Sequence, residues 1–194
     1  MATKSTSTPA WFPGVAKPAP MPLMLVQAFL NTLDREEGTD LLADVDSARA
    51  WLVASGLLGR SAAISLADLE FARDIRESIR GLLVLDGGER RDPGRLRPLR
   101  ELLDNHRARL RVSDDGVVSL ENGASEDLGE ALFELLLIIR AAQEDGTWKR
   151  LKACANPDCA WVFYDRSRNQ QGNWCEMAVC GNRLKNRHFR ARRR

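Results

Sequence analysis

The spacing of apolar residues predicts helices over most of the first 147 residues. Between Leu23 and Leu33, and again between Leu69 and Leu83, apolar side chains recur every three or four positions, which places them on one helix face. The same pattern predicts helices over 46–54, 93–103 and 126–144. The last of these is apolar on several sides, so we expect it to lie at the centre of its domain.

Residues that favour helix ends support these assignments. Asp46 and Ser125 are expected to cap the second and the last helix, and Ser65 with Asp68 has the pattern of a capping box. Pro93 fits the first turn of a helix. Glycines follow the second and the last helix, as is common at helix C-termini.

Other local patterns divide the chain into three parts. Residues 1–20 are rich in Pro, Ser, Thr and Ala and are expected to form a flexible leader. In the helical domain, 21–147, apolar and polar residues alternate on both sides of Asp115-Gly116, which predicts one small hairpin. Residues 148–194 carry all the cysteines and form a separate module. The expected fold class is therefore mainly α with a small β-hairpin (α+β).

Composition and charge separate the C-terminal module from the rest. The chain has 194 residues, 44% hydrophobic and 29% charged, which is typical of a soluble globular protein. The sequence has neither an apolar run long enough to cross a membrane nor the apolar core of a secretory signal, so we expect a cytoplasmic protein with no membrane partner. Residues 148–194 hold 12 Lys and Arg against three acidic residues, a net charge of +9, and the remainder carries −7. This asymmetry indicates nucleic-acid binding or a solvated tail.

The cysteines have the spacing of a metal site. Cys154 and Cys159 form one pair, Cys175 and Cys180 form the other, and 15 residues lie between the pairs. This pattern is typical of a tetrahedral structural zinc site, although common zinc ribbons have two residues within each pair, not four. Two disulfides or redox-active thiols are the alternative, which the cytosolic context and the paired spacing disfavour. Four thiolates leave no open position on the metal, so one structural Zn²⁺ per chain is expected.

The residues between the cysteines predict a small fold around this ion. Asn156-Pro157-Asp158 favours a turn, 161–164 favours a strand, and 169–172 favours a second turn that leads to Trp174. Cys175 and Cys180 lie about one helical turn apart, at the start of a helix. A knuckle, a hairpin and a helix around one zinc form a treble-clef-like arrangement. The aromatic residues of this module either fill the hairpin core or stack on single-stranded bases.

Four short motifs carry a resemblance to a known family. These are LKAC at 151–154, DRSRN at 165–169, WC at 174–175 and CGNR at 180–183. Over about 148–194 the chain resembles the CGNR zinc-finger family. The helical module resembles the ABATE domain that usually precedes this finger, on domain order, on Asn31-Thr32 and on length. The resemblance implies a bacterial, zinc-dependent, DNA-binding regulator of the stress response in which Cys154, Cys159, Cys175 and Cys180 are the metal ligands.

Basic residues of the module are the candidate nucleic-acid contacts. They follow the second strand and the last cysteine: Arg166, Arg168, Arg183, Lys185, Arg187, Arg190, Arg192 and Arg193. If the last helix continues, Arg183, Arg187 and Arg190 share one face, which would enter a major groove or follow the phosphate backbone. Arg166, Arg168 and Arg183 fit equally well as side chains that brace the fold.

The preferred hypothesis is a transcription regulator that binds double-stranded DNA. The helical domain would then sense a small apolar ligand or form a homodimer. An RNA- or ribosome-associated zinc protein and a protein-interaction module are the alternatives, the latter binding an acidic partner or its own acidic half. No Gly-rich phosphate loop and no Ser/His/Asp or Cys/His set is visible, so we expect no enzymatic activity.

Overall fold

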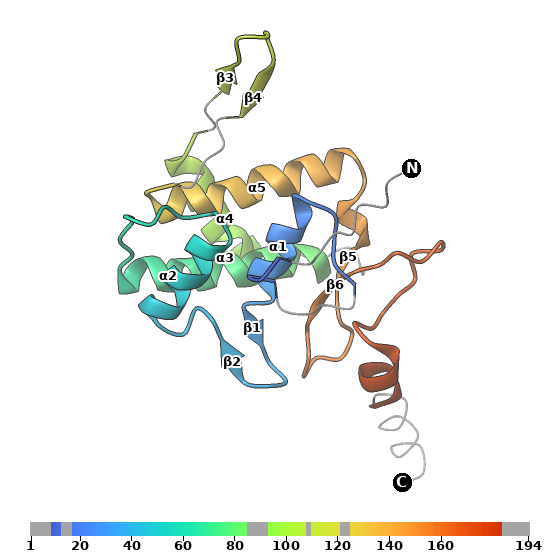
Figure 1. The fold of residues 1–194 in the computed structure, drawn as a ribbon. Helices are drawn as coiled ribbons and strands as arrows, with labels where there is room; N and C mark the ends of the chain where they lie inside the picture. The colour runs from blue at the N-terminus through green and yellow to red at the C-terminus, as the bar shows by residue number, and fades with distance from the viewer. Residues whose placement is uncertain (1–8, 13–16, 85–92, 108–109, 121–124, 184–194) are drawn as a thin grey trace.

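The computed structural model describes residues 9–12, 17–84, 93–107, 110–120 and 125–183 (Figure 1). Its α-helices are α1 (Leu23–Leu30), α2 (Val45–Ala54), α3 (Leu66–Val84), α4 (Arg97–Asn105) and α5 (Leu128–Glu144). Three short helical turns are η2 (Pro93–Leu96), η3 (Trp148–Arg150) and η4 (Met177–Gly181). None of the helices in these ranges combines the length and the apolar character that a membrane span requires.

The strands form three separate two-stranded antiparallel hairpins within the described residues. They are β1 (Leu33–Asp34) with β2 (Thr39–Asp40), β3 (Leu110–Val112) with β4 (Val118–Leu120), and β5 (Leu151–Ala153) with β6 (Val162–Tyr164). The β3–β4 hairpin is the one predicted around Asp115-Gly116, where Gly116 has a φ of +80°. It projects away from the helices (Figure 1). The mainly α, α+β fold class is confirmed.

The helix starts differ from the sequence predictions at two of three caps. The capping box is confirmed, because Ser65 N donates to Asp68 Oδ2 at 2.8 Å and Asp68 N donates to Ser65 Oγ at 3.2 Å. The cap of α2 is Asp44 rather than Asp46, and the cap of α5 is Asp127 rather than Ser125. Each of these carboxylates accepts a bond from the backbone N–H three residues later.

The β1–β2 hairpin was not predicted, and a buried ion pair holds it in place. Arg76 of α3 is only 3% exposed in its side chain, and its Nη1 and Nη2 donate to the two carboxylate oxygens of Asp40 at 2.6 and 2.7 Å. Arg76 Nη1 also donates to Thr32 Oγ1 at 2.9 Å. A bidentate pair of this kind fixes direction as well as distance, so the hairpin has a defined position on α3.

One hydrophobic core extends through the helical part and into the C-terminal module. Helix α1 packs against α5 and α3, and α3 also packs against α4 and α5. Fully buried members from these helices include Phe29, Ile75, Ile79, Leu132 and Leu135. Trp148, Leu151, Val162 and Tyr164 belong to the same core, although they lie beyond the helical segment in the chain. The hairpin β5–β6 is therefore part of the main core.

The leader differs from the flexible segment expected for residues 1–20, as far as it is described. Phe12 is 2% exposed and lies in the core, and Trp11 O accepts a bond of 3.1 Å from Trp51 Nε1. Ala19 is also buried, and Lys17 O accepts a bond of 3.0 Å from Tyr164 N. Apolar and backbone contacts thus hold residues 9–12 and 17–20 against the fold, although their composition predicted a flexible segment.

Candidate metal centre

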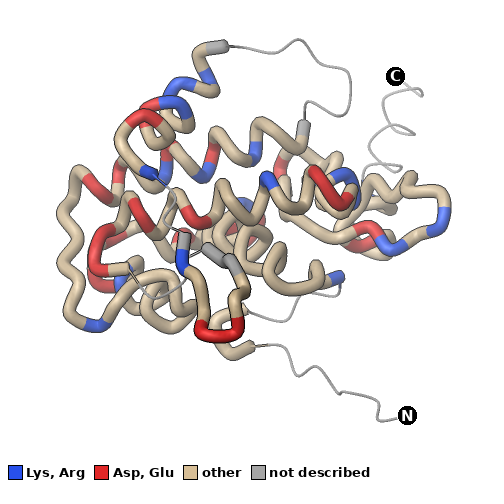
Figure 2. Tube along the Cα trace, turned by 90° about the horizontal axis from the view of Figure 1, so that it is seen from above, with Lys and Arg blue, Asp and Glu red and all other residues tan. Residues whose placement is uncertain are grey.

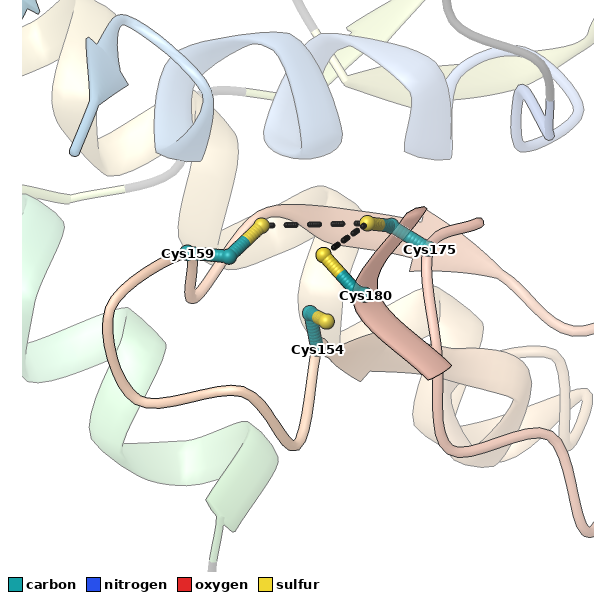
Figure 3. Close-up of side chains that lie close together, drawn as sticks. All are labelled: Cys154, Cys159, Cys175 and Cys180. Atoms are coloured by element: carbon teal, nitrogen blue, oxygen red, sulfur yellow. Dashed lines mark hydrogen bonds between the residues drawn. The ribbon is translucent and has the colours of Figure 1, made fainter. Parts of the chain in front are cut away.

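The four cysteines converge from two separate parts of the C-terminal module. Cys154 follows β5, Cys159 lies in the loop before β6, and Cys175 and Cys180 lie just before and within η4. Their side chains point toward one another (Figure 3). All four Sγ atoms lie within 4.8 Å of one another, and the Cys159–Cys175 and Cys175–Cys180 sulfur distances are both 3.7 Å.

These distances fit one zinc ion. Zinc bound to four thiolates at about 2.3 Å in a tetrahedron separates the sulfurs by about 3.8 Å. A disulfide would require about 2.05 Å, and all four cysteines are free. The chain thus carries a zinc finger whose four thiols are placed to hold one structural ion, as the cysteine spacing predicted.

The ionisation of one thiol in the cluster affects the ionisation of the others. Hydrogen bonds from Cys159 and Cys175 lower the pKa of Cys154, and the same hydrogen bonding raises the pKa of Cys175. One thiolate therefore opposes ionisation of its neighbours within the cluster. A divalent cation removes this conflict, because it attracts all four thiolates at once.

The first cysteine pair is shaped by the turn that the sequence predicted. The N–H groups of Cys159 and Ala160 both donate to Asn156 O at 3.0 Å. Asn156 is 2% exposed, and its Nδ2 lies 3.9 Å from Cys180 Sγ, within range of a hydrogen bond to sulfur. The turn therefore holds its own two cysteines and also contacts a ligand of the other pair.

The second pair is shaped by the CGNR segment, and each of its residues has a separate role. The N–H groups of Cys180 and Gly181 both donate to Glu176 O, and the bond from Gly181, five residues further along, gives η4 its π-helical turn. A Cβ added at Gly181 would meet Met177 Sδ, so the exposed Met177 side chain packs directly on this glycine and would have to move for a larger residue. Asn182 Nδ2 donates to Ala178 O at 3.1 Å and closes the turn. Sequence reasoning missed the packing role of this glycine.

The strand predicted at 161–164 is β6, and the structure supplies its partner. It pairs with β5, with Lys152 opposite Phe163. The cysteines of the first pair therefore lie in the loop that joins the two strands. The segment after 172 contacts that loop through a 2.8 Å bond from Ala155 N to Asn173 O.

Asp165 organises the loop between β6 and Cys175, a role that sequence reasoning missed. Its buried carboxylate accepts bonds from Lys152 Nζ at 2.9 Å, Ser167 N at 3.0 Å and Gly172 N at 2.7 Å. Burial would raise the pKa of Asp165, but the hydrogen bonds from Ser167 and Lys152 lower it well below its usual range. A DRS sequence directly after an aromatic strand was the available signal.

The aromatic residues of the finger are mainly packing residues. Phe163 and Tyr164 are 1% and 8% exposed, while Trp161 and Trp174 are half-buried against the cysteine cluster. This agrees with the interpretation that they fill the hairpin core. Lys17 lies over the ring of Phe163, with its Nζ 4.8 Å from the ring centroid.

Three buried side chains of the helical part bind the β5–β6 hairpin. Asn31 Nδ2 donates to Val162 O and Asn31 Oδ1 accepts from Val162 N, both at 2.8 Å. Gln27 Nε2 donates to the same carbonyl at 3.0 Å, and Arg80 Nη1 donates to Ala160 O at 2.8 Å. Asn31 thus replaces a neighbouring strand along the free edge of β6.

The candidate nucleic-acid residues have different surroundings. Arg166 is exposed and donates to Pro18 O at 2.8 Å, and Arg183 forms an ion pair with Glu36 of the β1–β2 loop. Arg168 is exposed and has no hydrogen-bond or ion-pair partner within the described residues. The other candidates lie outside the described residues: Lys185, Arg187, Arg190, Arg192 and Arg193. Basic positions also occur on the helices, where acidic positions are interspersed with them (Figure 2).

The fold and the cysteine cluster define a helical protein with a four-cysteine zinc finger at its C-terminal end. Comparison with protein families agrees: residues 150–193 match the CGNR zinc finger. Residues 23–144 match the ABATE family, described as "Putative stress-induced transcription regulator". This second match spans more than half of the chain, so the chain belongs to the ABATE family. A comparison with curated proteins found no match.

Proposed function

We propose that this protein is a transcription regulator that binds double-stranded DNA through its zinc finger and the basic residues that follow it. The observation that carries the proposal is a CGNR zinc finger with a net charge of +9 over 148–194. Four thiolates and one zinc ion together add about −2, which leaves about +7 for contact with phosphates. The ABATE description as a transcription regulator supports the same function.

In this proposal the helical part receives the signal and the finger contacts DNA. The bonds of Asn31, Gln27 and Arg80 to the β5–β6 segment support coupling between them, because a shift of α1 or α3 would move the finger. A homodimer and a response to stress stay predictions of the same model.

The first experiment selects genomic DNA fragments with the zinc-loaded full-length protein and sequences them. A variant with all four cysteines changed to serine is the control. We expect the fragments selected by the wild-type protein to share a sequence motif, and those selected by the control variant to lack it. Selection without a motif would contradict sequence-specific regulation, and a preference for RNA at matched salt would favour the RNA-associated alternative.

Arg168→Ala is expected to weaken DNA binding in a salt-dependent way. If the protein neutralises about six phosphates, the logarithm of the binding constant falls with the logarithm of salt concentration at a slope of about −5. Removal of one phosphate contact should reduce the steepness of that slope by about 1. Fluorescence anisotropy with a labelled duplex at several salt concentrations measures both the affinity and its salt dependence.

The matched control for this variant is Arg111→Ala on the β3–β4 hairpin. Arg111 is also an exposed arginine without a hydrogen-bond or ion-pair partner in the described part of the chain. Its removal should leave the slope unchanged. Equal slopes for both variants would assign Arg168 to the solvated surface.

Glu36→Gln is expected to strengthen DNA binding by about threefold, because it releases Arg183 from its ion pair. The Arg183 side chain is 51% exposed, so the released guanidinium is accessible to a phosphate. Glu37→Gln is the matched control, since Glu37 is the adjacent exposed carboxylate. An affinity equal to that of the control would show that Arg183 does not contact DNA.

A further inference from the structure

A cavity of about 690 Å³ lies between helix α3 and the finger. The helical side of its wall includes Glu77, Arg80 and Gly81, and the finger side includes Lys152, Ala155 and Asn173. Its volume falls within the range of pockets that hold small molecules, about 300–1,000 Å³. It lies at the junction of the two modules rather than inside the helical part, where an apolar ligand was expected.

The polar groups around the cavity are predominantly cationic. Among the described residues of its wall, five are basic and Glu77 is the one carboxylate. The basic residues are Arg35, Arg80, Arg95, Lys149 and Lys152. Glu77 lies 3.2 Å from Arg35 and 3.3 Å from Arg80, and Lys152 is paired with Asp165. Lys149 is exposed and has no hydrogen-bond or ion-pair partner in the described part of the chain. The wall therefore carries a surplus of positive charge.

The remainder of the wall is apolar. It includes Leu83, Leu151, Ala153, Pro157 and Ala160. An inorganic ion would leave these surfaces unused, whereas a molecule with an apolar body and one anionic group would contact both kinds of surface. Such a mixture of apolar lining and a few charged groups is the usual composition of a ligand site.

Gly81 keeps part of this cavity open. Glycine is among the least favourable residues in a helix interior, and Gly81 lies within α3. A Cβ added at Gly81 would meet no atom within 4 Å, whereas one added at Gly129 or Gly181 would collide with a neighbouring side chain. Neighbouring side chains thus occupy the space beside the latter two glycines, whereas the space beside Gly81 is open. Its effect is to leave space in the cavity wall.

Arg80 gives the site a buried cationic group. Its side chain is 7% exposed, and its two terminal nitrogens donate to the carbonyls of Ala160 and Leu30. Its Nε makes no hydrogen bond, although it lies 3.3 Å from Glu77 Oε2. The guanidinium is thus held rigidly at the junction of α3 with the finger.

We propose that this cavity binds a small organic anion, a carboxylate or phosphate on an apolar body, as the effector of the protein. The inference rests on the proposed function, because it supplies the signal that the regulator receives. The wall includes Cys154 and both partners of the bond between Ala155 and Asn173. An occupant therefore contacts the backbone beside two metal ligands, Cys154 and Cys175, and stabilises their loops.

The test uses the zinc-loaded full-length protein and two related fluorescent probes. 8-Anilinonaphthalene-1-sulfonate has an aromatic body with one sulfonate, and N-phenyl-1-naphthylamine has the same body without it. Fluorescence titration is expected to show one sulfonate probe per chain, bound at least about tenfold more tightly than the neutral probe. Equal affinity for the two probes would overturn the assignment of an anion site.

Two substitutions locate the probe. Gly81→Phe fills the cavity and is expected to weaken binding of the sulfonate probe by at least about tenfold, while the smaller Gly81→Ala should retain it and unfold at a higher temperature. Should Gly81→Phe fail to fold, Lys149→Glu is expected to weaken binding of the sulfonate probe, with Arg111→Glu as the control of equal charge change. Unchanged binding in Lys149→Glu, or in a folded Gly81→Phe variant, would overturn the proposal.

These measurements contain no DNA, so they separate the two proposals. If the protein did not bind DNA, the results of the probe titrations would be unchanged. If the sulfonate probe did not bind in the cavity, the DNA-binding proposal would be unaffected. If both hold, the sulfonate probe should alter the affinity for a selected duplex in the wild type and not in Gly81→Phe.

Discussion

Cys175→Ser is expected to reduce bound zinc from one ion per chain to almost none after dialysis against a chelator. A serine hydroxyl remains protonated near neutral pH and does not replace a thiolate on zinc. A structural zinc site contributes about 10–16 kcal/mol in isolated zinc-finger peptides, so the loss of one ligand removes the largest local source of stability. Metal analysis after dialysis measures the effect directly.

Hydrogen exchange should show where this loss acts. The amides of Ala155, Cys159 and Cys180, whose bonds lie around the cysteine cluster, are expected to lose protection. The amides of β5 and β6 should keep most of theirs, because Leu151 and Val162 are buried in the main core.

Ala178→Ser is the control for this variant, since Ala178 is exposed on the same turn as Cys180. It introduces the same hydroxyl without removing a sulfur atom. Full zinc retention in Cys175→Ser after dialysis would contradict the four-thiolate site.

Asn31→Leu is expected to lower the free energy of unfolding by about 3 kcal/mol. Leucine has the same number of side-chain heavy atoms as asparagine, branched at the same carbon, but leaves Val162 N without a partner, and Val162 is fully buried. The carbonyl of Val162 keeps its bond from Gln27, so the cost falls mainly on the N–H. Urea unfolding of the zinc-loaded protein gives the difference.

Asn105→Leu provides the comparison for Asn31→Leu. Asn105 is exposed, and its single bond of 2.9 Å goes to Glu101 O in the same helix. Its loss should cost less than about 0.5 kcal/mol, the ordinary range for surface substitutions. If both variants lost the same stability, the contact between Asn31 and β6 would not stabilise the fold.

The metal centre and the main helices could be predicted from the sequence because their signals are local. Pairs of cysteines at fixed spacing and apolar residues at helical period need no knowledge of the rest of the fold. Gly116 marked its turn and the Ser65–Asp68 box marked its helix start for the same reason. The caps at Asp44 and Asp127 were each missed by two residues, since each lies close to another residue that favours capping.

What the sequence did not predict depends on contacts between distant segments. Asn31 was part of the resemblance to the ABATE domain, but the sequence did not show its partner, Val162, which lies 131 residues further along the chain. Three other features also depend on contacts between distant segments: the pairing of β6 with β5, the burial of Phe12 in the core and the Arg76–Asp40 ion pair. Local patterns carry no information on which of several available partners a strand or a charge will choose.

The shared core has a consequence for how the chain is made. A ribosome completes the helical segment first, but Leu151, Val162 and Tyr164, which close its core, emerge later. The nascent helical segment therefore keeps apolar surface exposed until the finger has been synthesised, and the two are expected to fold as one cooperative unit. A chimaera that joined this helical segment to a different finger would therefore have to retain β5 and β6 of this chain.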